Sequence, residues 1–382
     1  MVPNLRFNEF SLSWHQMRII DLLSFQNGIN GTPEQYGKGI KYISVGDILN
    51  NDYITYDKIA GSIDINQETL KNYSVTYGDI LFQRSSEIKE DIGRTNVYLD
   101  KDHTATFGGF VIRGKKIGDY NPTFFNYLLK SPSSRQSIVR LGAGAQHYNI
   151  GQENIKTLNF YFPDEEEQQK IANLFSKIDE RIQTQIKIID TLLSEINSIR
   201  SLIFNKSSLK WIPLKDIVAE QDIKLKRGKV IPKHKKNLKY IYPVYSSSIT
   251  NSGLMGYSDS YMFNQELITW SIDGGGNFFY RKKHKFNITN VSGYMILNEN
   301  LFNYQFIVQS LIWQHEKLKF DYQTKAHPSV VESLYKIPIM DLEEQHKYAC
   351  LFSNLNEKYE LELHILDLLN MQKKYLLKNM FV

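Results

Sequence analysis

The chain has 382 residues, of which 42% are hydrophobic and 13% aromatic, and this is enough for two or three domains with sizeable cores. Its one cysteine, Cys350, excludes a disulfide framework and a cysteine-based zinc site and fits a reducing, cytoplasmic setting. No apolar stretch approaches the roughly 18 residues of a membrane span, and the N-terminus lacks the apolar core of a signal peptide. The formal net charge is only +5, so its distribution along the chain is more informative than its total.

Residues 1–160 are predicted to form a first globular module, in which 17 basic side chains nearly balance 16 acidic ones. The sequence GDILF, which begins at Gly78, is typical of a strand. A helix is predicted to begin after Asn121, with Asn121 as its N-cap and Pro122 in its first turn. This module should therefore combine strands with helices.

Residues 161–206 are predicted to form one long helix. Asp164 is a suitable N-cap, and the acidic residues that follow it favour the positive end of the helix dipole. Neither glycine nor proline interrupts residues 164–206, so the helix should be roughly 60 Å long. Apolar residues recur at helical spacing, namely Ile171, Phe175, Ile178, Ile182, Ile186, Ile189, Leu193, Ile196, Ile199 and Ile203. So narrow a stripe needs a partner helix.

Residues 207–336 are predicted to form a second module, which is basic, with 18 Lys and Arg against 10 Asp and Glu. One basic run covers residues 224–239, and its members are Lys224, Lys226, Arg227, Lys229, Lys233, Lys235, Lys236 and Lys239. A second run consists of Arg281, Lys282, Lys283, His284 and Lys285. Such runs are typical either of a solvated face or of a surface that contacts phosphates.

Residues 337–382 repeat the first long helix. The sequence from Asp341 aligns without a gap with the sequence from Asp164, at an offset of 177 residues and with about 14 identities over roughly 42 positions. The shared E-E-Q motif ends at Gln168 in the first copy and at Gln345 in the second. A weaker similarity relates Trp14 to Trp211 at an offset of 197, so the first module should be about 20 residues longer than the second.

The simplest partner for each long helix is the other copy. The seam is predicted to contain Phe175, Ile178, Ile182, Ile189, Phe352, Leu355, Tyr359 and Leu366. Asn370 and Lys373 interrupt the second stripe; they either fix the register as polar seam residues, or the helix rotates and uses Leu369 instead. We predict an α+β fold, with two globular α/β domains separated by two long helices that pack as an antiparallel, pseudo-twofold coiled coil and place the domains at opposite ends.

The helix sequences DEEEQQKIANLFSKIDERI, from Asp164, and DLEEQHKYACLFSNLNEKYE, from Asp341, resemble the conserved helical regions of the specificity subunit of type I restriction–modification systems. The module sequences GDILFQRSSEIKEDIGRTNVYL, from Gly78, and YPVYSSSITNSGLMGYSDSYM, from Tyr242, resemble that family more loosely. The resemblance covers nearly the whole chain.

This resemblance implies two target-recognition domains, at residues 1–160 and 207–336, each of which reads one half of a bipartite, asymmetric site in double-stranded DNA. It implies that the helices at 161–206 and 337–382 fix the spacing and dock two methyltransferase subunits, which restriction/motor subunits then join. It further implies that the chain performs no catalysis and binds no cofactor, because S-adenosylmethionine is held by the methyltransferase.

Within such an architecture, cationic and hydroxyl side chains are candidates for contacts with phosphates and base edges. The candidates in the first module are Lys38, Lys41, Arg84, Arg94 and Tyr148. The candidates in the second module are Lys226, Arg227, Lys229, Ser247, Arg281, Lys282 and Lys283. Arg84 and Arg94 are equally suited to surface ion pairs, because Glu87, Glu90 and Asp91 are close in sequence.

The alternative is a stand-alone nuclease or methyltransferase-like protein that dimerises through its helices. The sequence from Asn121 to Phe124 is similar to the N-P-P-aromatic loop of adenine methyltransferases, but a helix start explains it better. Asp79, Glu87 and Lys89 imitate a metal-nuclease set that is common by chance, and the histidines form no metal-ligating pattern. The sequence thus predicts neither a catalytic nor a metal site.

Overall fold

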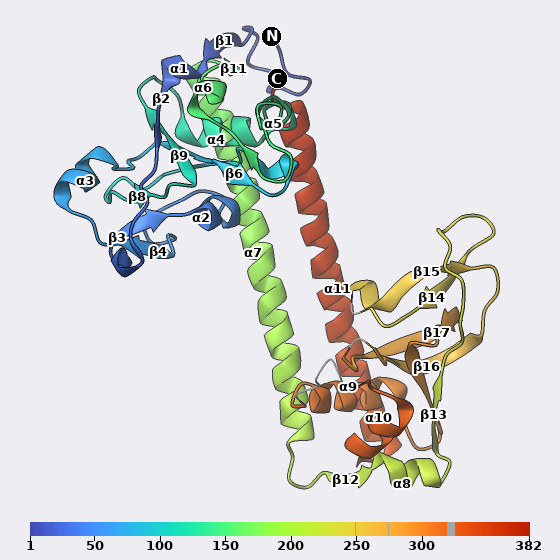
Figure 1. Ribbon diagram of the computed structural model, residues 1–382. Helices are drawn as coiled ribbons and strands as arrows, with labels where there is room; N and C mark the ends of the chain where they lie inside the picture. The colour runs from blue at the N-terminus through green and yellow to red at the C-terminus, as the bar shows by residue number, and fades with distance from the viewer. Residues whose placement is uncertain (249, 274, 319–324) are drawn as a thin grey trace. The chain divides into compact units, whose positions relative to one another are not determined.

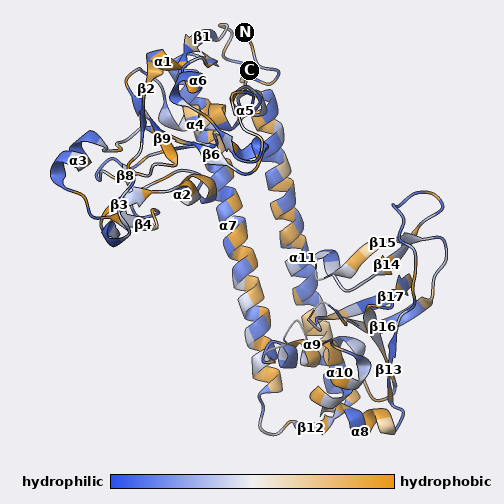
Figure 2. Ribbon diagram, viewed as in Figure 1, coloured by the Kyte–Doolittle hydropathy of each residue, from blue (hydrophilic) through white to orange (hydrophobic). Residues whose placement is uncertain are grey.

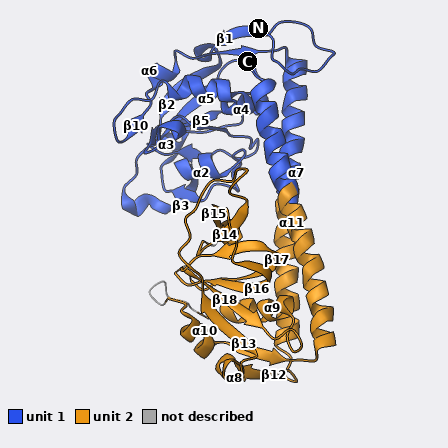
Figure 3. Cartoon of the chain, turned by 90° about the vertical axis from the view of Figure 1, so that its right-hand side faces the viewer, with its two compact units in different colours: residues 1–185, 365–382 blue, residues 186–364 orange. Residues whose placement is uncertain are grey.

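The computed structural model describes every residue except 249, 274 and 319–324 (Figure 1). The chain divides into two compact units, of which unit 1 comprises residues 1–185 and 365–382 and unit 2 comprises residues 186–364 (Figure 3). Each unit contains an α/β domain and parts of the two long helices, so the predicted α+β fold is confirmed.

The first domain contains eleven short strands and six short helices among its described residues, followed by the first long helix. The elements are β1 (His15–Arg18), α1 (Ile19–Leu22), β2 (Leu23–Asn27), β3 (Tyr36–Ile43), α2 (Val45–Asn50), β4 (Gly61–Ile63), α3 (Gln67–Asn72), β5 (Ile80–Gln83), β6 (Ser85–Ser86), β7 (Thr95–Val97), β8 (Thr106–Phe107), β9 (Val111–Lys116), α4 (Pro122–Lys130), α5 (Pro132–Val139), β10 (Tyr148–Asn149), α6 (Gln152–Ile155), β11 (Asn159–Phe162) and α7 (Glu165–Phe204).

The second domain follows the same plan with fewer elements and ends in the second long helix. The elements are β12 (Lys210–Pro213), α8 (Leu214–Ala219), β13 (Ile223–Arg227), β14 (Tyr242–Tyr245), β15 (Leu254–Ser258), β16 (Phe263–Ser271), β17 (Phe278–Ile288), β18 (Ser292–Leu297), α9 (Tyr304–His315), α10 (Pro328–Leu334), β19 (Lys336–Ile339) and α11 (Leu342–Asn379).

The central sheets of the two domains have the same strand order. In unit 1 the order is β2-β9-β5-β7, and in unit 2 it is β13-β18-β16-β17, extended by β14 and β15. The registers of the two sheets also match. In unit 1, Ile80 on β5 pairs with Gly114 on β9 and with Val97 on β7. In unit 2, the equivalent Ile268 on β16 pairs with Met295 on β18 and with Tyr280 on β17. The duplication inferred from the helices therefore includes the sheets, where sequence similarity is faint.

The two-stranded sheets at the domain entrances correct the predicted offset of 197. His15 pairs with Phe162, and Lys210 pairs with Ile339. Phe162 and Ile339 are 177 residues apart, the same offset that relates the two long helices. His15 is thus equivalent to Lys210, at an offset of 195, and Trp14 is not equivalent to Trp211. The two indoles have different roles. Trp14 packs edge-on against Phe124, whereas Trp211 stacks on Trp313.

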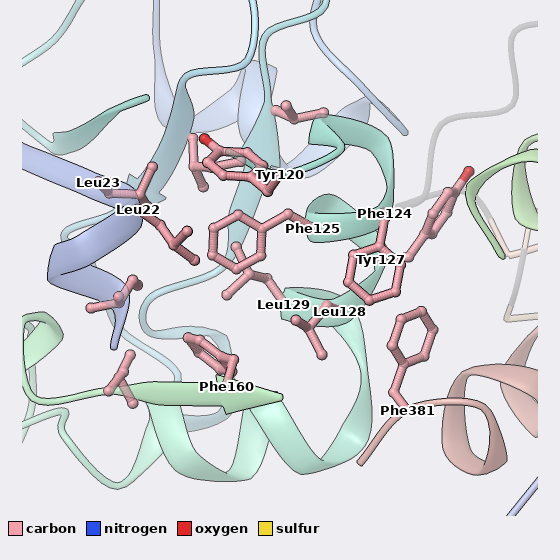
Figure 4. Packing of buried hydrophobic residues seen from close by; sticks show 14 of the residues in the cluster. Leu22, Leu23, Tyr120, Phe124, Phe125, Tyr127, Leu128, Leu129, Phe160 and Phe381 are labelled. Carbon is pink, nitrogen blue, oxygen red and sulfur yellow. The ribbon is translucent and has the colours of Figure 1, made fainter. Parts of the chain in front are cut away.

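One face of each central sheet is covered by a helix that joins the sheet to the long helices. In unit 1, α4 contributes Phe124, Phe125 and Leu128, which are fully buried and pack with Phe160 and Phe381 (Figure 4). In unit 2, α9 contributes Phe306, Ile307 and Leu311 to a core that also contains Phe204 and Phe352. The domain cores thus continue into the long helices.

The long helices are packed together in antiparallel fashion, as predicted. In unit 1 the first turns of α7 lie against the last turns of α11, where Phe175 is 5.6 Å from Phe381 between ring centroids. In unit 2 the end of α7 lies against the start of α11, and Lys206 Nζ donates to the hydroxyl of Tyr348 at 3.1 Å. Figure 2 shows hydrophobic and hydrophilic residues mixed along both helices, as expected when only one stripe is buried.

Two details of the seam differ from the predicted stripe. On α7, Leu192 is buried whereas Leu193 is 41% exposed, because 3.6 residues per turn makes a straight stripe drift. On α11, Leu369 is buried and Asn370 is exposed, which favours the rotated helix over a polar seam at Asn370. Lys373 forms an ion pair with Asp179 on α7 at 2.5 Å, so it contributes a charge pair to the helix interface.

Candidate nucleic-acid interface

The glutamine of each E-E-Q motif fastens a domain to a long helix. Gln168 is buried, and its Oε1 accepts from the backbone amide of Asn121 at 3.0 Å, directly before α4. Gln345 does the same for Asn303 before α9, at 2.9 Å. Both asparagines also cap their helices through their own side chains, as was predicted for Asn121. A buried amide that bridges helix and domain explains why the motif is present in both copies.

The eight predicted seam residues differ in burial. Phe175, Ile178, Ile182, Ile189 and Phe352 are buried, whereas Leu355, Tyr359 and Leu366 are half-buried. The half-buried residues all lie on α11. This helix also has the apolar side chains of Leu361, Leu368 and Met371 more than 48% exposed.

In the first domain, Lys38 and Lys41 lie on β3, and both have protein partners. Lys38 is exposed, and its Nζ is 3.2 Å from a carboxylate oxygen of Asp64. Lys41 Nζ donates to the backbone carbonyl of Ile59 at 2.7 Å. Both are near the surface, but a phosphate contact would have to replace these interactions.

The other three candidates of the first domain lie elsewhere. Arg84 is exposed and donates through one guanidinium nitrogen to the carbonyl of Gly109 at 3.3 Å. Arg94 forms an ion pair with Asp91 at 2.6 Å, the alternative that the sequence left open. Tyr148 is half-buried against the core of unit 1.

In the second domain, backbone pairing carries the first basic run across the sheet. Lys229 bridges to Thr289 beyond the end of β17, and His234 pairs with Tyr257 on β15. Lys236 Nζ lies 5.5 Å from the ring centroid of Tyr257. The run therefore reaches the sheet edge formed by β14 and β15.

Of the second basic run, Lys285 also lies near this edge, with its Nζ 5.9 Å from the ring centroid of Tyr242 on β14. Lys285, on β17, has its Nζ 4.9 Å from the ring centroid of Tyr261. Arg227 and Lys226 are exposed at the end of β13, where the guanidinium of Arg227 donates to the carbonyl of Asn290 at 2.8 Å. Lys236 and Lys285 are thus additional candidates, and the sequence signal for both is their membership of the two basic runs.

Arg281 does not lie in an exposed basic run. It is only 5% exposed, its guanidinium stacks 3.8 Å from the ring centroid of Tyr245, and its Nε donates to Thr269 Oγ1 at 2.9 Å. Burial lowers the pKa of Arg281 to about 10. Successive side chains of a strand point to opposite sides, so the four basic residues of this run and His284 do not share one face.

The remaining candidates of the second domain are also separated. Lys282 is exposed and lies 3.2 Å from Glu357 on α11, and Lys283 is exposed. Ser247 is half-buried, and its carbonyl accepts from the hydroxyl of Ser271 at 2.8 Å. Lys282 therefore faces the long helix instead of the basic edge.

The nuclease-like set is not assembled. Asp79 is buried, accepts from the amide of Lys116 at 2.9 Å and forms an ion pair with Arg113 at 3.7 Å. Burial raises the pKa of the Asp79 carboxyl. Glu87 and Lys89 are exposed on a separate loop. Over the described part of the chain, no three His, Cys, Asp or Glu side chains gather where a metal ion would fit. The described helices include none that is both long and apolar enough to cross a membrane.

The sequence matches one protein family twice. The family described as "Type I restriction modification DNA specificity domain" matches residues 13–193 and again residues 210–371. The two matches cover most of both halves of the duplication.

Individual relatives carry the same description over shorter stretches. A Mycoplasma pneumoniae protein named as a type I specificity subunit is 34% identical over 115 residues, which are 28% of this chain and 36% of that protein. The HindI type I restriction enzyme specificity subunit of Haemophilus influenzae is 26% identical over 159 residues, 40% of this chain and 33% of that protein. The matched regions thus span roughly a third of the length of these relatives.

A solved structure shares the whole fold. The crystal structure of the type I restriction-modification S subunit from M. genitalium superposes with a TM-score of 0.65 at 20% identity, over 100% of this chain and 99% of that one. This similarity concerns the fold alone. The family match over both repeats shows that the chain belongs to the type I restriction modification DNA specificity domain family.

Proposed function

We propose that this chain is the DNA specificity subunit of a type I restriction–modification complex and performs no chemistry itself. Each recognition domain reads one half of a bipartite, asymmetric site, and the paired helices set the distance between the halves. The observation that carries this proposal is the contrast within the duplication, in which the long helices align without a gap while the domain loops differ. A constant frame that presents different readers suits a site with two different halves.

The basic edge of the second domain supports the DNA-reading role. Lys236 lies over the ring of Tyr257 on β15, and Lys285 lies over the rings of Tyr242 on β14 and of Tyr261. Lys229 pairs with Thr289 beyond the end of β17. Lysines neutralise phosphates, and their binding releases counterions, so affinity should fall steeply with salt. Neighbouring tyrosine and serine hydroxyls are suitable for base edges.

The exposed apolar residues of the long helices support a protein partner. Leu202 is 72% exposed on α7, and Leu361 and Met371 are 57% and 59% exposed on α11. We assign these faces to two methyltransferase subunits that hold S-adenosylmethionine, to which restriction/motor subunits then attach.

The proposal is tested by methylation with purified components. The chain and its methyltransferase are assayed together and separately, and methylated positions are mapped by sequencing. Site-specific methylation should require both proteins and should fall in a two-part sequence. Methyl transfer by the chain alone, or specific methylation by the methyltransferase without the chain, would contradict the proposal.

A further inference from the structure

The two units differ at the outer edge of equivalent sheet strands, β7 in unit 1 and β17 in unit 2. In unit 1 the strand that contains β7 is covered by residues 51–56, here called the covering segment. The amide of Ile54 donates to the carbonyl of Val97 at 2.9 Å, and the amide of Leu99 donates to the carbonyl of Ile54 at 2.8 Å. Ile54 thus pairs with this strand in parallel orientation and is fully buried.

Asp52, in the covering segment, fills the space between β7, α4 and α7. Its carbonyl accepts from Asn126 Nδ2 at 3.0 Å and from Lys130 Nζ at 2.7 Å. Its carboxylate accepts from Gln183 Nε2 at 3.3 Å. The covering segment therefore forms hydrogen bonds with the strand edge, with the domain helix α4 and with the long helix α7.

The duplication identifies the matching positions in unit 2. The sheet registers, the two N-cap asparagines and the helix offset of 177 give the correspondence. The equivalent pairs are Val97 and Tyr280, Leu99 and Lys282, Asn126 and Val308, Lys130 and Ile312, and Gln183 and Glu360.

In unit 2 this space is open. A cavity of about 470 Å³ lies between β17, α9 and α11, and its lining includes Tyr280, Lys282, Gln305, Phe352, Glu357 and Glu360. β14 pairs with β17 only at Asn287 and Ile288, so among the described residues the outer edge of β17 at residues 280–282 has no strand partner. The elements that surround the cavity, β17, α9 and α11, are labelled in Figure 1.

Among the residues of unit 2 that the structure describes, no segment takes the place of the covering segment. The connection from β14 to β15 covers residues 246–253, about half the length of the connection from β3 to β4 at residues 44–60. Its ends are tied together, because the amide of Ser246 donates to the carbonyl of Gly253 at 2.8 Å. Within this connection, the backbone carbonyl of Ser247 accepts a hydrogen bond from the hydroxyl of Ser271.

We propose that this groove binds an extended segment of a separate protein, which adds as a parallel strand to β17 and places a lysine or arginine beside Glu360. The carbonyl of Tyr280 would accept a hydrogen bond from an amide of that segment, and the amide of Lys282 would donate to one of its carbonyls. In unit 1 the carbonyl of Val97 and the amide of Leu99 bond to Ile54 in the same way. Main-chain pairing at a free strand edge beside a side-chain pocket is a general mode of peptide recognition.

The charge of the groove selects the basic side chain. In unit 1 the carboxylate of Asp52 faces the amide of Gln183. In unit 2 the position equivalent to Gln183 is Glu360, which lies one helical turn from Glu357. The position equivalent to Lys130 is Ile312, so unit 2 has no amine there. Lys282 already lies 3.2 Å from Glu357, and among the described residues no cation pairs with Glu360, so its carboxylate is available to a cation from the partner.

The open edge itself is tested by hydrogen exchange in the full chain, with the first unit as internal control. The amide of Lys282 should exchange at least tenfold faster than the amide of Leu99, which is bonded to Ile54. Equal protection of the two amides in the free chain would overturn the proposal, because the edge would already be covered.

The occupant is tested with two labelled octapeptides of residues 50–57, one native and one carrying Asp52→Lys. Fluorescence anisotropy with the full chain should show at least tenfold tighter binding of the lysine peptide, together with slower exchange at Lys282. The variant Glu360→Gln restores the residue type of Gln183 and should abolish this preference. Glu195→Gln removes the same charge from an exposed position on α7 and should leave it unchanged.

Three results would overturn the proposal. The first is failure of the lysine peptide to bind, and the second is an unchanged preference in Glu360→Gln. The third is sedimentation of the free chain as a dimer whose dissociation exposes the Lys282 amide, which would assign the groove to a second copy. None of these measurements involves DNA, so they fail or succeed independently of the proposed recognition function.

Discussion

The two halves of this chain agree in the short helix, the glutamine and the aromatic ring that attach each domain to the long helices, and they differ in the loops that connect the strands. Gln168 and Gln345 hold the same backbone position in both domains, and Phe175 and Phe352 occupy the same buried site. By contrast, the connection at residues 44–60 includes α2 and the covering segment, whereas its counterpart is short. The strands and helices that attach each domain to the long helices are therefore a fixed support, whereas the loops between the strands vary, even where one of them reaches a long helix.

The first way to break this comparison is to remove the shared aromatic ring. Phe175→Ala and Phe352→Ala should each lower the free energy of unfolding by about 3–5 kcal/mol, because each leaves a cavity in a domain core. Leu361→Ala, at a position 57% exposed, should change it by less than about 0.5 kcal/mol. Denaturant unfolding measures all three. A large difference between the two phenylalanine variants would show that the duplication is not energetically equal.

The glutamines should have a smaller but equally matched effect. Gln168→Leu leaves the amide of Asn121 without its acceptor, and Gln345→Leu does the same to Asn303. Each should cost about 1–3 kcal/mol, the range for an unsatisfied buried group. Glu343→Gln, in the same motif but exposed, serves as control. Unfolding midpoints unaffected by both leucine substitutions would rule out the fastening role.

The basic edge should distinguish the domains by salt dependence. Lys236→Ala and Lys285→Ala should each reduce the slope of log affinity against log salt by about 1, if each lysine neutralises one phosphate. Lys38→Ala in the first domain should have less effect, because Lys38 already pairs with Asp64. Titrations of the methyltransferase complex on its mapped site at several salt concentrations measure these slopes. Equal slopes for all variants would move the DNA surface elsewhere.

The pH dependence of stability should also distinguish the two units at Lys130, whose counterpart in unit 2 is Ile312. Burial lowers the pKa of Lys130 from 10.5 to about 8. Between these values the unfolded chain binds more protons than the folded chain, so this group makes stability rise with pH from about 8 to 10.5. Lys130→Met should remove that rise. Parallel stability curves for the two proteins from pH 8 to 10 would contradict it.

The sequence predicted the repeated helices well because their pattern is local. Periodic apolar residues and the ungapped E-E-Q register indicated helix length, antiparallel partner and N-cap without any knowledge of the sheets. It failed where long-range pairing decides. The similarity of Trp14 to Trp211 suggested an offset that the strand register corrects, and Arg281 is buried although its neighbours are cationic. The open groove could not be predicted from the sequence, because only the strand registers identify the residues of unit 2 that correspond to those contacted by the covering segment in unit 1.

The central claim is that constant helices hold two independent readers. It is tested most directly by replacing residues 207–333 with the corresponding domain of another family member and mapping methylated sites in cells that also carry the methyltransferase. We predict that one half of the recognised sequence changes while the other half and the spacer length stay the same. A change in both halves, or in the spacer, would contradict it.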